Sequence, residues 1–240
     1  MRNFAVVLSA LMPAAGCAAA DISDLSASVL KLAEPCCTAA GAAAIASPDF
    51  GRSGNLMKWF IASDIHGSAL YCRQMLEACD REKADRLLLL GDLLYHGPRN
   101  DLPDGYAPKE VIALLNARSD EIYCVRGNCE AEVDQMVLSF PVMADYLLLP
   151  EGDRCIFVTH GHLYNEDHLP PLKTGDILLH GHTHVSFCHP HETFICCNPG
   201  SVSLPKENTP RGYMVLENGR FIWKTLSGEA YRTLDLRQSD

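Results

Sequence analysis

The 240-residue chain lacks any uninterrupted apolar run of about 18 residues, the length that a membrane-spanning helix needs. Positive charge is also scarce, because 20 Lys and Arg face 30 Asp and Glu and give a formal net charge of −10. This balance argues against an extended nucleic-acid-binding surface, which requires clustered basic side chains. Ordinary glycine, proline and charge contents exclude collagen-like, coiled-coil and disordered classes. The sequence therefore predicts a globular protein with one sizeable core.

Zinc-finger cysteine spacing is absent as well. The chain has 11 cysteines, an odd number that cannot pair completely, and no two are separated by two residues. The adjacent pairs Cys36-Cys37 and Cys196-Cys197 do not have zinc-ligand spacing either. This pattern favours free thiols over a disulfide scaffold, so we predict a cytoplasmic protein.

Histidine is missing from residues 1–56, which contain 15 alanines, whereas all ten histidines follow Met57. The first twelve residues resemble a short signal peptide, with a plausible cleavage site at Ala18–Ala20. The alternative is a mis-assigned start that precedes a natural start at Met57, and the free cysteines favour this second interpretation over export. We expect residues 1–56 to form an Ala-rich disordered extension and residues 57–240 to form the domain.

Short apolar runs alternate with helical patterns from Lys58 onward. Strands are predicted at Lys58–Ser63, Arg86–Leu90, Glu121–Arg126, Tyr146–Leu149, Arg154–Thr159, Ile177–His180, Thr193–Cys196, Tyr213–Glu217 and Phe221–Thr225. Helices are predicted at Ala69–Glu82, Pro108–Arg118 and Ala131–Leu138. This order, βαβαβ followed by hairpins, indicates an α/β domain of two stacked mixed sheets covered by helices.

Metal-binding residue types follow five of the predicted strands. They occur in Asp64-Ile65-His66, Gly91-Asp92, Gly127-Asn128, His160-Gly161-His162 and Gly181-His182-Thr183-His184. Each motif alone is also typical of an ordinary turn or loop cap. Because the carboxyl ends of neighbouring strands meet at one crevice, we expect the five ends to converge.

Imidazole, carboxylate and amide oxygen ligands suit Mn, Fe, Ni or Zn better than Mg or Ca. Seven such ligands are too many for one tetrahedral zinc ion. They suit two ions that share a bridging carboxylate and lie about 3.5–4 Å apart. The sequence therefore predicts a binuclear metal centre.

The same motifs, in the same order, resemble those of the calcineurin-like metallophosphoesterases. The segments around them resemble the bacterial YfcE-like phosphodiesterases in detail, namely Ser63–Ser68, His96–Asn100, Arg126–Cys129 and Asn198–Ser201. The resemblance covers residues 57–240 and none of residues 1–56. It implies a four-layer α/β/β/α sandwich of two mixed sheets and a phosphoesterase, foremost a phosphodiesterase.

The resemblance also implies the ligand sets. One ion would be held by Asp64, His66, Asp92 and His184. The other would be held by Asp92, Asn128, His160 and His182, so that Asp92 bridges them. The implied cofactors are two divalent ions, Mn²⁺ foremost with Zn²⁺, Fe²⁺ or Ni²⁺ as alternatives, and a bridging hydroxide would attack phosphorus in line.

Further residues are expected to act on the substrate. Asp92 and Asn128 are expected to be catalytic as well as ligands. Many relatives have histidine after the asparagine, where it can protonate the leaving oxygen, but this chain has Cys129, a poor proton donor by its ordinary pKa of about 8.5. His162 and His96 are alternative donors, or they position substrate.

Arginine side chains are expected to bind the substrate phosphate. Arg99 lies in the loop after Asp92 and could clamp a phosphate oxygen, as could Arg126. A salt bridge within the protein is an equally good interpretation of each.

Two other functions remain open at this point. A metal-free scaffold on the same fold could bind a protein partner, although all seven ligand positions are filled. A metallo-β-lactamase-type hydrolase would explain His180-x-His182-x-His184, but Val185-Ser186 replace the Asp-His expected next. We expect a small phosphoester substrate, no membrane span and, by family resemblance alone, a homodimer.

Overall fold

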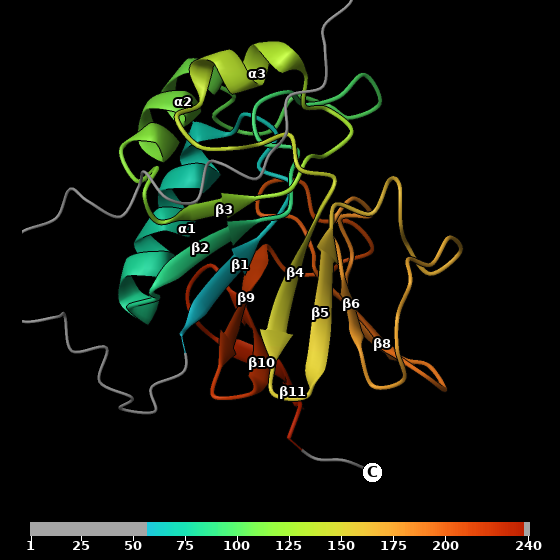
Figure 1. Cartoon of the computed structure of the whole chain (residues 1–240). Coiled ribbons are helices and arrows are strands. Elements are labelled where there is room, and N and C mark those ends of the chain that lie inside the picture. Colours follow the sequence, from blue (N-terminus) through green and yellow to red (C-terminus); the bar gives the residue numbers. More distant parts are fainter. Residues whose placement is uncertain (1–56, 238–240) are drawn as a thin grey trace, which may run out of the picture. The chain divides into compact units, whose positions relative to one another are not determined.

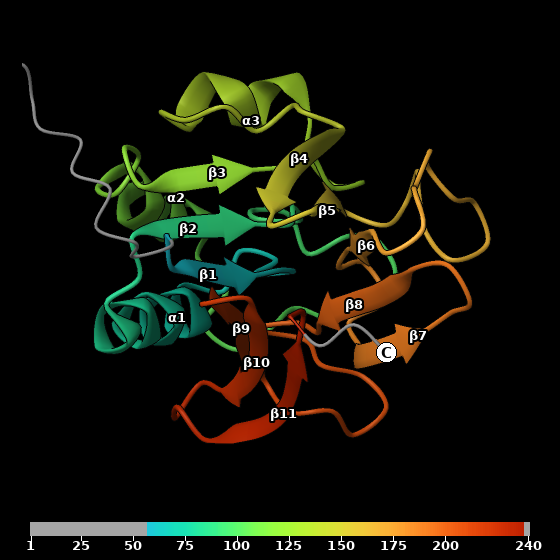
Figure 2. The same ribbon diagram turned by 60° about the horizontal axis from the view of Figure 1, so that its bottom comes forward.

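A computed structural model describes residues 57–237, and the predicted N-terminal extension lies outside this range. The first sheet has six strands in the order β11-β10-β9-β1-β2-β3. Their bounds are β1 Trp59–Ala62, β2 Arg86–Leu89, β3 Ile122–Cys124, β9 Gly212–Glu217, β10 Arg220–Thr225 and β11 Ala230–Asp235. β1 pairs in parallel with β2, as β2 does with β3, whereas β9, β10 and β11 continue the sheet as antiparallel strands (Figure 2).

The second sheet has five strands in the order β4-β5-β6-β8-β7. Their bounds are β4 Tyr146–Glu151, β5 Arg154–Thr159, β6 Ile177–Leu179, β7 Ser186–Pro190 and β8 Ile195–Pro199. The central strands β5, β6 and β8 are parallel, and the outer strands β4 and β7 are antiparallel to their neighbours. Both sheets are thus mixed, which confirms the predicted α/β architecture.

Alternating side chains of the first sheet fill two different cores. Phe60 and Leu87 pack beneath helices α1 (Ala69–Glu82) and α2 (Pro108–Asn116). Ile61 and Leu88, one residue further along each strand, pack against the second sheet instead. Figure 1 shows the two helices on one side of β1 and β2 and the second sheet on the other. Since strand side chains alternate between faces, these apolar runs specify burial on both sides.

The outer face of the second sheet carries no helix in the described part of the chain. The three described helices, including α3 (Glu132–Val137), all precede β4. Phe157, Leu178 and Phe187 on this face are instead packed by Tyr164 and Leu172 of the loop between β5 and β6. The fourth layer is therefore a loop, because the chain between β5 and β6 carries apolar side chains without a helical period.

Two strands of the structure, β7 and β11, were not predicted from the sequence. β7 ends in Cys188-His189-Pro190, a polar sequence that proline confines to a sheet edge. β11 is also an edge strand, and its partly exposed side chains show no clear alternation. In addition, β8 extends to Pro199, beyond the predicted end at Cys196. β7 and β11 lack a clear apolar alternation, whereas the other two edge strands, β3 and β4, contain the apolar residues that predicted them.

No helix within residues 57–237 has both the length and the apolar character needed to cross a membrane. All eight cysteines in this range are free thiols.

We predict that Leu88→Ala will lower the free energy of unfolding by about 2–5 kcal/mol, because it opens a cavity between the two sheets. The matched control is Leu148→Ala on β4, whose side chain is 54% exposed and should change stability by less than about 0.5 kcal/mol. Urea denaturation in chelator measures both values without a contribution from bound metal. Equal effects of the two substitutions would contradict this account of the core.

Candidate active site

The five predicted motifs meet where strands β1, β2, β3, β5 and β6 end. Hydrogen bonds join the loops directly: the His66 backbone N–H donates to Asp92 O at 2.9 Å, and the Gly181 N–H donates to His160 O at 2.8 Å. Asp64, Asp92 and His182 adopt left-handed backbone conformations, with φ values of 58°, 55° and 67°. The same holds for His66 and His184. Such conformations are uncommon for residues other than glycine and concentrate at functional sites.

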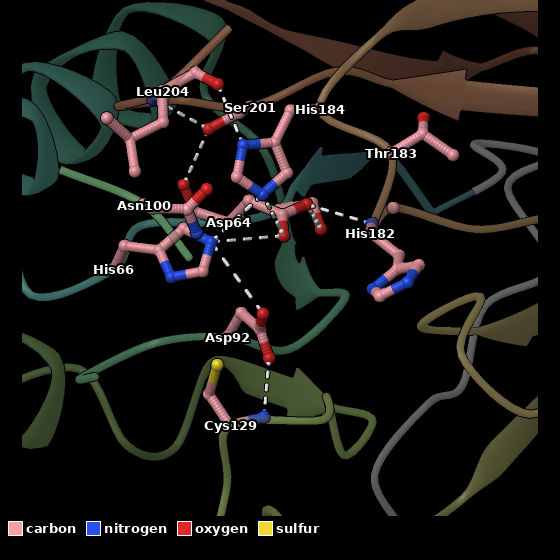
Figure 3. A network of polar contacts seen from close by, with 12 residues as sticks. Asp64, His66, Asp92, Asn100, Cys129, His182, Thr183, His184, Ser201 and Leu204 are labelled. Atoms are coloured by element: carbon pink, nitrogen blue, oxygen red, sulfur yellow. Dashed lines mark hydrogen bonds and ion pairs between the residues drawn. The ribbon is translucent and has the colours of Figure 1, made fainter. Parts of the chain in front are cut away.

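One group of ligand atoms gathers around Asp64 (Figure 3). Its Oδ1 lies 3.3 Å from His184 Nε2 and 3.5 Å from His66 Nε2. The two Nε2 atoms are 3.0 Å apart. Atoms bound to one ion at about 2.0–2.2 Å are separated by about 3–3.6 Å, so these spacings suit a shared metal ion.

The histidine tautomers strengthen this interpretation. Nδ1 of His66 and of His184 lies 2.8 Å from the carbonyl oxygens of Tyr95 and Leu204, respectively. Nδ1 of His160 lies 2.6 Å from Leu90 O. A carbonyl only accepts, so each neutral imidazole carries its proton on Nδ1 and directs the Nε2 lone pair into the site.

Asp64 itself is completely buried, and its Oδ1 has no hydrogen-bond donor in the described chain. Its Oδ2 accepts hydrogen bonds from Ser63 Oγ at 2.6 Å and from the His182 backbone N–H at 3.1 Å. Burial opposes ionisation of Asp64, but its contacts with His184 and His66 outweigh burial and hold its pKa well below the ordinary range. The low pKa of Asp64 reflects positive charge on the contacting imidazoles; with neutral imidazoles, a bound metal cation would stabilise the same carboxylate.

Asp92 links this group to a second one. Its Oδ2 lies 3.7 Å from His66 Nε2 and 3.6 Å from His160 Nε2, while its Oδ1 accepts from the Cys129 backbone N–H at 2.9 Å. His160 Nε2 lies 3.2 Å from Asn128 Oδ1 and 3.2 Å from His182 Nδ1. One carboxylate oxygen therefore lies between two ligand groups, as a bridging ligand must.

The second group includes a histidine with a strongly shifted pKa. Burial and the neighbouring His160 lower the pKa of His182 to about 4, so its imidazole is neutral at pH 7. Neutral imidazole is the form that binds metal. The seven predicted ligand side chains thus all converge on one site, and their donor chemistry fits two divalent ions.

Glu130 is a functional residue that the sequence analysis missed. Its buried carboxylate accepts backbone N–H groups from Asp92 at 2.9 Å, Leu93 at 2.7 Å and Gly127 at 2.5 Å. Burial and the charge of Asp92 raise its pKa. Glu130 therefore fixes the left-handed turn that presents Asp92. The close approach also explains Gly127, because a Cβ there would overlap Asp92 Oδ1.

A cavity of about 410 Å³ opens over the second ligand group. It is lined by Asp92, Gly97, Pro98, Arg99, Asn100, Asn128, Cys129, His182, Thr183, His184 and Lys206. Arg99 thus lies where the sequence predicts a substrate contact. The Cys129 thiol is close to the reacting centre, since its sulfur, a nitrogen of His66 and an oxygen of Asp92 lie within 4.8 Å of one another.

Three other predicted residues do not line this cavity. The ring of His162 lies beside that of His160, with centroids 5.4 Å apart. His96 packs edge-on against Tyr106, with centroids 5.4 Å apart. Arg126 forms an ion pair with Asp145 at 3.1 Å, which corresponds to the salt-bridge interpretation of this residue.

The profile of the calcineurin-like phosphoesterase superfamily domain matches residues 57–219. The chain belongs to this superfamily. It is 44% identical over 163 residues to phosphodiesterase YfcE of Escherichia coli K12, covering 68% of this chain and 89% of YfcE. A solved structure of E. coli YfcE, described as a phosphoesterase, has a TM-score of 0.73 at 40% identity and covers 75% of this chain and 100% of that one.

A more distant relative is the probable metallophosphoesterase YsnB of Bacillus subtilis, which is 27% identical over 167 residues. That match covers 67% of this chain and 83% of YsnB. The predicted resemblance is confirmed, and this member of the superfamily is a hydrolase of phosphoester bonds that has candidate ligands for divalent metal.

We predict that Glu130→Gln will weaken metal binding by about 10–100-fold, the usual effect of losing a group that orients a ligand. The amide supplies one oxygen and one N–H₂ group where three backbone N–H donors converge, so the turn at Asp92 should loosen. Glu132→Gln, at an exposed position of α3, is the matched control. Metal titration by calorimetry gives the affinities, and equal affinity in both variants would contradict the assigned role.

Proposed function

We propose that this protein is a binuclear metal-dependent phosphodiesterase that acts on small phosphoesters. The observation that carries the proposal is the position of Asp92 Oδ2 between the two ligand groups, 3.7 Å from His66 Nε2 and 3.6 Å from His160 Nε2. Asp64, His66, Asp92 and His184 would hold one ion, and Asp92, Asn128, His160 and His182 the other. Imidazole and carboxylate donors support Mn²⁺ as the first candidate, with Zn²⁺, Fe²⁺ and Ni²⁺ as alternatives.

When bound, the two ions supply Lewis acidity and lower the pKa of water that attacks phosphorus. The protein's own residues then orient the reaction. Asp92 and Asn128 line the cavity, where they would face the scissile phosphate. Arg99 lines the same cavity and can donate two parallel hydrogen bonds to an anionic group of the substrate. The cavity volume of about 410 Å³ is suited to a small ligand.

The presence of Cys129 after Asn128 supports phosphodiester substrates whose leaving groups need little protonation. Burial and the charge of Asp92 raise the pKa of the Cys129 thiol, so it keeps its proton at neutral pH. A group that holds its proton so firmly is a poor general acid. His162, the other candidate donor, lies next to His160 but does not line the cavity, and burial lowers its pKa, so at neutral pH it mostly lacks the proton that a general acid needs. The 44% identity to a protein named phosphodiesterase supports the same substrate class.

A cytoplasmic location and a homodimer remain predictions. The eight free cysteines of residues 57–237 support a reducing compartment.

Removing metal with chelator should abolish hydrolysis of an aryl phosphodiester, and Mn²⁺ should restore it. Asp92→Ala should reduce kcat by about 1,000-fold or more and lower the bound metal from two ions to none, because both groups lose their shared oxygen. Asp153→Ala, on an exposed turn, is the matched control. Two bound ions and ordinary turnover in Asp92→Ala would refute the bridge. A wild-type protein that binds no metal would favour the scaffold alternative.

Cys129→His should change which leaving groups are tolerated. An imidazole at this position can protonate a leaving oxygen, so the advantage of nitrophenyl over phenyl esters should shrink by about tenfold. The measurement compares kcat/KM for the two esters in wild type and variant. A ratio that does not change would mean that position 129 takes no part in departure of the leaving group.

A further inference from the structure

A second cavity shares part of its lining with the first. It has a volume of about 310 Å³ and is lined by Arg99, Asn100, Asp101, Ser203, Leu204, Pro205, Lys206 and Arg211. Arg99, Asn100 and Lys206 line both cavities. These three residues form the junction of the two cavities, with Asp92 in the lining of the first and Arg211 in the lining of the second. A ligand that reaches from the first cavity into the second would contact them.

Arg99 and Lys206 are exposed, and neither forms an ion pair with a carboxylate anywhere between residues 57 and 237. Many other basic side chains are paired, such as Arg118 with Glu121 and Lys224 with Glu82. Asp101 is the one acidic residue among those lining the second cavity. In a chain of net charge −10, this junction is thus a local surplus of positive charge.

Hydrogen bonds hold the backbone on each side of the junction, and on the Lys206 side they reach a predicted metal ligand. The Lys206 N–H donates to His184 O at 3.0 Å, and Thr209 Oγ1 donates to Lys206 O at 2.8 Å. On the other side, Asn100 Nδ2 donates to His96 O at 2.8 Å and stabilises the turn that carries Arg99. Both cations therefore start from anchored positions, so a substrate can meet them at a reproducible distance from the reacting phosphate.

Arg211 extends the positive surface to the far end of the second cavity. Its guanidinium lies over the Tyr71 ring, 4.5 Å from the centroid, and its Nε donates to Ser203 O at 3.3 Å. These contacts hold the side chain without neutralising its charge.

We propose that the preferred substrate is a small phosphodiester that carries a second anionic group, bound by Arg99 and Lys206 while the diester lies over Asp92. This inference rests on the proposed function and adds its substrate class. Guanidinium binds phosphate or carboxylate through paired hydrogen bonds, and the lysine ammonium adds a mobile point charge. The acidic remainder of the chain would repel a long polyanion, so the second anion belongs to a small molecule.

Equilibrium binding tests the subsite without turnover. The full chain, loaded with Mn²⁺, is titrated with thymidine 5′-monophosphate and with thymidine 3′,5′-bisphosphate, which differ only in the second phosphate. We expect the bisphosphate to bind at least about fivefold more tightly. The double variant Arg99→Gln, Lys206→Gln should reduce this preference to near one. Lys109→Gln, at an exposed position of α2 that lines neither cavity, is the matched control and should keep it.

Kinetics provide the second measurement. The 4-nitrophenyl ester of thymidine 5′-phosphate is compared with the same ester bearing a 3′-phosphate, so leaving group and diester are identical. We expect kcat/KM to favour the second ester by a similar factor in wild type and Lys109→Gln, and by much less in the double variant. The preference should also shrink from about 0.05 M to about 0.5 M salt, because exposed charges are screened. Replacing the 3′-phosphate by a carboxylate shows which anion is preferred.

The outcomes separate the two proposals. Equal affinity of the two nucleotides in wild type, or a preference that survives in the double variant, overturns the subsite. Tighter bisphosphate binding that depends on Arg99 and Lys206, together with no metal-dependent cleavage of either ester, supports the anion subsite and overturns the proposed hydrolysis. Thermal denaturation confirms that the variants are folded, and their exposed side chains contribute nothing to the core.

Discussion

The structure depends on one constraint: the carboxylates and imidazole nitrogens of the site must lie close together while buried from water. Asp64 and Asp92 are almost inaccessible to water, and the Nε2 lone pairs of three histidines face them at 3.3–3.7 Å. Without a neighbouring positive charge, the carboxylates and imidazole lone pairs would repel one another, and their burial removes the water that would otherwise solvate them. Positive charge has to offset that cost. Burial opposes protonation of His66, but its contact with Asp64 raises the pKa of this imidazole, so the site favours positive charge.

The loops and the apolar core between the sheets hold these carboxylates and imidazoles in place. Loops from both sheets bond across the site, and Ser201 Oγ and Ser203 Oγ both donate to Asp64 O. Glycines occupy the positions where loops touch, since a Cβ at Gly181 would overlap the Ser63 hydroxyl. Ile61, Leu88 and Val158 pack between the two sheets and join β1, β2 and β5 in one apolar core. The apolar core and the polar site therefore determine the same relative position of the sheets.

Much of this was predictable because the relevant signals are local. Ligand residues directly follow apolar strands, and parallel strands bring their carboxyl ends to one edge, so the convergence of Asp64, Asp92 and His160 could be inferred. Glu130 could not, because a carboxylate that accepts backbone N–H groups has no distinguishing sequence pattern. Lys206 was missed for a related reason: its neighbourhood depends on a loop from another part of the chain. Likewise, edge strands β7 and β11 have little apolar alternation to reveal them.

We assign the two cavities different roles in substrate recognition. In the proposed function, the ligand groups around Asp92 would contact only the phosphate that all phosphoesters share, so they would provide reactivity with little selectivity. Selectivity would then come from the groups that we propose for the second anion, Arg99 and Lys206 at the junction, with Arg211 beyond it. All three belong to loops whose backbones are fixed to the site but whose side chains reach solvent. Substitutions at these three loop positions would leave Asp64 and Asp92 in place. The same metal-binding arrangement could therefore act on different substrates.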